Sequence, residues 1–87
     1  MSQVPNFKKV NYKVIFCRLD GRVLLTKQIA YMTKLLPTGE TNPVAFREHV
    51  RGRRDNGGQG DPYRGFIGII KIEAKSESIK HELRFES

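Results

Sequence analysis

The dipeptide Asp20-Gly21 constrains the fold more than any other feature, because it joins two apolar runs. Residues 10–19 read VNYKVIFCRL, and residues 22–34 read RVLLTKQIAYMTK. Asp-Gly between such runs is the strongest short-range signal for a tight β-hairpin, since a type I′ turn needs positive φ at both of its central residues. We therefore predict an antiparallel hairpin in the N-terminal half of the chain.

The first run alternates as a strand should, whereas the second run fits two periodicities. A strand to about Lys34 suits the β-branched and aromatic residues of the second run, and we favour it. A strand followed by a helix is the alternative for residues 27–36, because four apolar residues follow helical spacing. These four are Leu25, Ile29, Met32 and Leu36.

Residues 66–74, FIGIIKIEA, and residues 79–86, IKHELRFE, predict a second hairpin that turns at KSES, residues 75–78. In the last strand we expect Ile79, His81, Leu83 and Phe85 to point inward. Residues 66–72 carry apolar side chains on both faces, and Gly68 within the run suggests a bulge or a close backbone approach. Such a strand needs cover on both sides. We therefore expect either a small barrel or a homodimer.

Asn42-Pro43 predicts the start of a short helix at about 43–51, because Asn is a favoured N-cap and proline suits the first helical position. Residues 52–65 then form a basic, glycine-rich segment that we expect to be a mobile loop. The predicted fold is α+β and mostly β: two antiparallel hairpins in a four- to five-stranded sheet or small barrel, with one helix. Residues 1–9 are expected to be a flexible arm, and residues 10–87 a single compact domain.

Composition excludes several classes of protein. One cysteine, Cys17, permits no disulfide within the chain and is expected to be a buried apolar residue, which fits the cytoplasm. No apolar run approaches the ~20 residues that span a membrane. The glycine-rich segment GGQGDPYRG lacks the Lys-Ser/Thr ending of a P-loop and precedes a strand, whereas a P-loop opens a helix. We therefore do not expect it to bind a nucleotide. With His49 and His81 far apart, we expect no metal site and no cofactor.

The formal net charge of +7 favours a polyanionic partner. Arginine forks bind phosphate in bidentate fashion, and aromatic rings stack on unpaired bases. We therefore predict a non-catalytic protein that binds nucleic acid, single-stranded DNA or RNA rather than duplex. The expected binding residues are Arg47, Arg51, Arg53, Arg54, Tyr63 and Arg64, with Phe7, Tyr12 and Tyr31 as further stacking candidates.

Two alternatives fit the same features. The basic surface would also suit a small protein-binding modulator or inhibitor, a type frequent among viral accessory proteins, that docks on an acidic partner or on a nucleic-acid-processing protein. A ribonuclease is the less favoured enzyme option, because His49 lies near several arginines in the sequence but in no specific motif.

Overall fold

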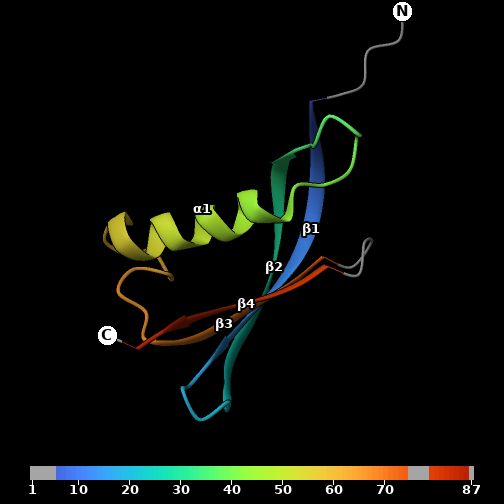
Figure 1. Ribbon diagram of the computed structural model, residues 1–87. Coiled ribbons are helices and arrows are strands. Elements are labelled where there is room, and N and C mark those ends of the chain that lie inside the picture. The colour runs from blue at the N-terminus through green and yellow to red at the C-terminus, as the bar shows by residue number, and fades with distance from the viewer. Residues whose placement is uncertain (1–5, 75–78, 87) are drawn as a thin grey trace, which may run out of the picture.

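The computed structural model describes residues 6–74 and 79–86. Its strands are β1 (Phe7–Cys17), β2 (Val23–Lys34), β3 (Gly68–Ala74) and β4 (Ile79–Phe85), and its helix is α1 (Pro43–Asn56). The strands form one antiparallel sheet in the order β2-β1-β3-β4. The sheet is strongly twisted, and α1 lies on one side of it (Figure 1). The mostly β, open arrangement confirms the broad fold prediction, but the strands do not close into a barrel.

The first hairpin is confirmed, and β2 is a strand to Lys34, so the helical alternative for this segment is wrong. Its turn differs from the prediction by one residue. Gly21 N–H donates to Arg18 C=O at 2.8 Å, and Arg18 N–H donates to Arg22 C=O at 2.8 Å. The connection is therefore three residues long, with Gly21 at φ 90°.

The core lies between α1 and one face of the sheet. Every second residue of β1 from Val10 to Phe16 is buried there, and the neighbouring strands and the helix complete the cluster. The Tyr12 ring stacks on Phe46 with centroids 4.1 Å apart and planes 3° apart. The other core members include Val10, Val14, Phe16, Val50, Ile70, Ile72 and Leu83. Burial of each large apolar side chain contributes about 1.5–3 kcal/mol, so this cluster holds the helix on the sheet.

Helix α1 begins where predicted, since Asn42 Oδ1 accepts the Val44 N–H at 3.1 Å and Pro43 follows the cap. It ends at Asn56 and not near residue 51. Gly52 does not stop it, because a glycine in a helix costs only about 1 kcal/mol. The side chains of Arg53 and Arg54 make tertiary contacts that stabilise the additional turn.

The expected loop at 52–65 therefore begins only at Gly57, and it is a chain of hydrogen-bonded turns. Gly57 N–H donates to Arg53 C=O at 2.8 Å, and Asp61 N–H donates to Gly58 C=O at 3.1 Å. Phe66 N–H donates to Tyr63 C=O at 3.0 Å. The expected mobility of this segment is not confirmed and stays a prediction.

The N-terminal arm is shorter than predicted. β1 begins at Phe7, so residues 7–9 of the expected arm belong to the sheet. The second hairpin is confirmed by the β3–β4 pairing, although its KSES turn lies outside the described residues.

Ile69 is only 5% exposed within one chain, whereas Ile67 is 53% exposed. Cover for Ile69 therefore requires neither a barrel nor a second copy.

Candidate nucleic-acid interface

Arg53 is bound to the segment that follows the helix. Its Nε donates to Asp61 Oδ2 at 2.7 Å, and its guanidinium lies 5.4 Å from the centre of the Tyr63 ring. Desolvation opposes ionisation of the largely buried Asp61 carboxyl, but hydrogen bonds from Tyr63 N–H and Arg53 outweigh it, so the pKa of Asp61 lies below its usual value. Arg53 is therefore engaged in contacts within the fold and is not free to bind phosphate as we expected.

Arg54 is also held by the fold. Its Nε donates to Phe66 C=O at 3.0 Å, and its guanidinium lies 4.8 Å from the centre of the Phe85 ring on β4. Its Nη1 lies 3.1 Å from Asp55 Oδ1. Gly65 N–H donates to the backbone C=O of Arg54 at 2.9 Å. The residue fastens the end of α1 to the sheet and to residues 65–66.

Tyr63 is only 1% exposed and packs against Phe16, with ring centroids 5.4 Å apart. Its hydroxyl is buried and has no hydrogen-bond partner among the described residues. Burial raises the pKa of Tyr63 to about 12. In this conformation the ring is part of the core and is not accessible for stacking on a base.

The other two tyrosines also face the helix. Tyr12 is buried, and its hydroxyl lies 3.0 Å from Thr33 Oγ1. Tyr31 is half-buried, with its ring 5.0 Å from Phe46 and 4.5 Å from His49. Desolvation lowers the pKa of His49, and the nearby Arg53 lowers it further. The structure thus places Tyr12 in the core and Tyr31 at its margin.

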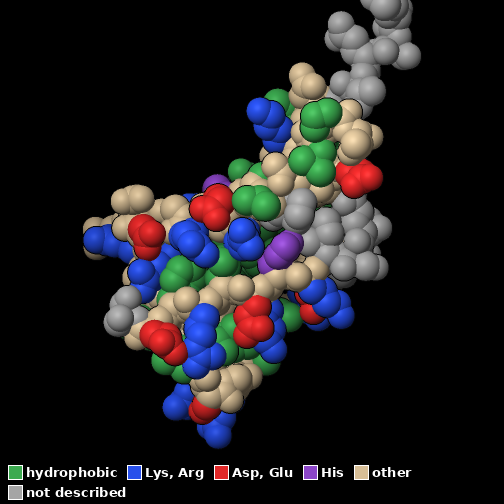
Figure 2. Space-filling view, viewed as in Figure 1, with side chains coloured by type: hydrophobic (Ala, Val, Ile, Leu, Met, Phe, Trp, Pro, Cys, Tyr) green, Lys and Arg blue, Asp and Glu red, His purple; other side chains and the backbone are tan. Residues whose placement is uncertain are grey.

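The remaining arginines of the predicted site are less constrained. Arg51 and Arg64 are exposed, and Arg64 directly precedes Gly65 beside the end of α1. Arg47 lies one turn before Arg51, 3.9 Å from Glu48, and its Nε is buried without a hydrogen-bond partner among the described residues. The space-filling view shows acidic side chains interspersed with the basic ones on the side that carries α1 and β4 (Figure 2). Three of the five predicted arginines thus have an acidic neighbour.

The sheet face opposite α1, here called the open face, was not predicted as a site. The register puts Phe7 opposite Lys34, and Lys9 opposite Met32, so the two exposed apolar groups alternate with two lysines. Phe7 is 53% exposed and Met32 is 57% exposed. Lys13 continues the same face two residues beyond Asn11, opposite Gln28.

No acidic residue occurs in β1 or β2, which together carry five lysines. The lysines on the open face of these two strands are Lys9, Lys13 and Lys34, and we call them the lysine strip. The sequence contained this signal: two paired strands with lysines and no carboxylate. Only the register shows which of the lysines share a face with Phe7.

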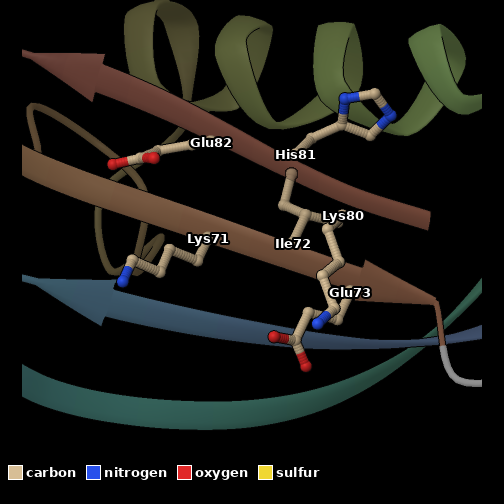
Figure 3. A pocket seen from close by; sticks show the side chains of 6 residues that line it. All are labelled: Lys71, Ile72, Glu73, Lys80, His81 and Glu82. Atoms are coloured by element: carbon tan, nitrogen blue, oxygen red, sulfur yellow. The ribbon is translucent and has the colours of Figure 1, made fainter. Parts of the chain in front are cut away.

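The β3–β4 half of the open face is different, because opposite charges are paired across the strands. Lys71 lies opposite Glu82, and Glu73 lies opposite Lys80. These four side chains line a shallow cavity of about 310 Å³ together with Ile72 and His81 (Figure 3). His81 points toward α1 in this view, whereas Lys71, Glu73 and Lys80 point away from it. This half of the face has little net charge to offer a polyanion.

Comparisons with known proteins give no relative: no family model, no curated protein and no solved structure matches the chain. Among residues 6–74 and 79–86, no cluster of three potential metal ligands occurs. Within the same residues, no helix is long and apolar enough to cross a membrane.

Proposed function

We propose that this protein binds single-stranded nucleic acid without catalysis, through the open face of its sheet. The observation that carries the proposal is the alternation of Phe7 and Met32 with the lysine strip on two strands that lack any carboxylate. Lysines attract the phosphate backbone, and an exposed aromatic ring offers a platform for a base. Stacking of this kind contributes roughly 1–3 kcal/mol per base.

The arginines of α1 take a secondary part in this proposal. Arg53 and Arg54 are held by structural contacts, whereas Arg51 and Arg64 are exposed cations at the same end of the molecule. On the open face, Lys9 and Lys34 have no acidic residue opposite them, whereas Lys13 lies opposite Glu73 of β3. A single strand is favoured over duplex, because the exposed Phe7 ring can stack on an unpaired base, which a duplex does not offer.

Fluorescence anisotropy with labelled oligonucleotides of about 15 nucleotides tests the proposal, using single-stranded DNA, single-stranded RNA and duplex DNA. Substitution of the lysine strip, Lys9→Gln, Lys13→Gln and Lys34→Gln together, is expected to weaken single-strand binding at least tenfold. The matched variant Arg47→Gln, Arg51→Gln and Arg64→Gln removes the same charge, and we expect a smaller loss from it. A larger loss from the arginine variant would place the site on α1.

Absence of binding to all three polymers would contradict the proposal. It would favour the alternative of a protein-binding modulator that docks on another protein. One observation supports that alternative. The tip of the first hairpin exposes Leu19, Val23 and Leu24, and Ile67 lies beside Leu19 around a hollow of about 360 Å³. Pull-down with the wild-type protein and a Val23→Asp variant would then be the relevant measurement.

A further inference from the structure

Strand β2 is an outer strand of the sheet, and its chemistry is unlike that of the other outer strand. Between Val23 and Thr33, β2 has one charged residue, Lys27. β4 carries three charged residues, Lys80, Glu82 and Arg84, in its seven positions. Charged side chains on an outer strand discourage pairing with another chain, and a long outer strand with few charges invites it. Of the two edges, β2 is the one suited to adding a further strand.

The hydrogen bonds show which backbone groups of β2 point outward. Leu35 N–H donates to Asn6 C=O on the β1 side at 2.8 Å. Because donors and acceptors alternate along an antiparallel pair, the odd-numbered residues of β2 face β1 and the even-numbered ones face away. The C=O of Lys34 agrees, since it accepts from Asn42 N–H on the other side at 3.4 Å. Thr26, Gln28 and Ala30 therefore direct their N–H and C=O groups away from the sheet.

We propose that a second copy of this chain pairs with the outer edge of β2, in an antiparallel dimer whose two-fold axis passes through Gln28. In this register residues whose numbers sum to 56 lie opposite each other. Leu25 then meets Tyr31 of the second copy on the helix face. Leu25 is a large apolar side chain that is 46% exposed in one copy. Leu24 is the extra residue of a β-bulge opposite Phe16 and Cys17, so the regular pairing begins at Leu25.

Neighbouring registers are less favourable. An axis through Lys27 places that lysine opposite its own copy, and like charges directly opposite each other destabilise a strand pair. An axis through Ile29 places Leu25 opposite Thr33 instead of Tyr31. The axis through Gln28 places Lys27 opposite Ile29, and its regular pairing uses residues 25–31, so the Asn42–Lys34 hydrogen bond is kept. Arg22 and Lys34 meet at the ends of the interface, where water and salt screen them.

A two-fold axis perpendicular to the sheet leaves both open faces on the same side. Two lysine strips then lie on the same side of one eight-stranded sheet. The consequence for nucleic-acid binding rests on the proposed function, whereas the dimer interface itself does not. A dimer would bind a longer single strand than one copy does.

Sedimentation equilibrium of the full chain without nucleic acid tests the dimer, at physiological ionic strength. One chain has a mass of 10.0 kDa, and we expect twice that value. Gln28→Pro removes an outward N–H while leaving the bonds to β1, so it is expected to give a folded monomer by circular dichroism. A monomeric wild-type protein, or a Gln28→Pro dimer, would overturn the proposal.

Disulfide trapping tests the register even if Gln28→Pro does not fold. Paired residues at the axis have Cα atoms about 5.5 Å apart, within the range of a disulfide. Gln28→Cys is therefore expected to form a covalent dimer on oxidation. Ala30→Cys is the matched control, because its counterpart in the second copy is Thr26, and we expect no cross-link. Cys17 is buried in both variants. Equal cross-linking of the two variants, or none in either, would contradict this register.

Discussion

Arg53 Nε lies 2.7 Å from Asp61 Oδ2, and this ion pair joins the last turns of α1 to the segment that returns to the sheet. Asp61 Oδ1 also accepts the Tyr63 N–H at 2.9 Å, so one carboxylate holds both the helix and the backbone that buries Tyr63. Arg53, which the sequence suggested for phosphate binding, is thus part of the folded framework.

Asp61→Asn is expected to lower the free energy of unfolding by about 1–2 kcal/mol at pH 7, because a largely buried carboxylate loses charge-assisted hydrogen bonds. The half-exposed Arg53 keeps the effect below the upper end of that range. Since the pKa of Asp61 is lowered in the folded state, its contribution is full above the unfolded pKa and disappears as the pH falls through the folded pKa.

Urea denaturation between pH 2 and 7 measures both effects, and the variant should show a weaker loss of stability in acid than the wild-type protein. Glu86→Gln is the matched control, because Arg84 and Glu86 form a surface pair at 2.8 Å that is expected to contribute about 0.5 kcal/mol or less. An Asp61→Asn variant as stable as the control would refute the anchoring role.

Much of the fold followed from local chemistry, whereas the arginine contacts did not. Asp20-Gly21 and the alternation of Tyr12, Val14 and Phe16 specify the hairpin and its buried face, because both signals act within a few residues. The partners of Arg54, which are Phe66 C=O and the Phe85 ring, lie 12 or more residues away in the chain. No local pattern separates such an arginine from an exposed one such as Arg51.

Local sequence patterns also failed to predict the burial of Tyr63 and the position of the lysine strip. Tyr63 stands in a glycine-rich run that has no other large apolar residue between 57 and 65, so burial was not expected for it. It is buried because Asp61 turns the backbone at that point and Phe16 provides a surface to pack on. The lysine strip was missed for the opposite reason, since it depends on which residues of β1 and β2 share a face.

Tyr63→Phe is expected to raise the free energy of unfolding by about 1–3 kcal/mol, because it removes a buried hydroxyl that lacks a hydrogen-bond partner among the described residues. Thermal unfolding followed by circular dichroism measures the change. The control is Tyr12→Phe, which removes a buried hydroxyl that lies 3.0 Å from Thr33 Oγ1 and should be destabilising. A loss of stability in Tyr63→Phe would show that its hydroxyl is satisfied in solution.

Gly68→Ala is expected to destabilise the protein by about 2 kcal/mol or more, since the residue has φ +144° and an added Cβ would lie against Cys17 C=O. Gly58→Ala is the control, because an added Cβ meets nothing within 4 Å there and should change stability by less than about 0.5 kcal/mol. Urea midpoints of the two variants make the comparison. Similar midpoints would mean that β3 does not enter the sheet through this close approach.

The salt dependence of single-strand binding tests the central claim most directly. Each phosphate neutralised by a cation contributes about −0.7 to the slope of log K against log salt for single strands. If the lysine strip meets the backbone, the triple glutamine substitution of Lys9, Lys13 and Lys34 should make the slope shallower by about 2, one contact for each lysine. The variant with Arg47, Arg51 and Arg64 replaced by glutamine should have a slope of log K against log salt close to that of the wild-type protein. An unchanged slope in the lysine variant would contradict the account.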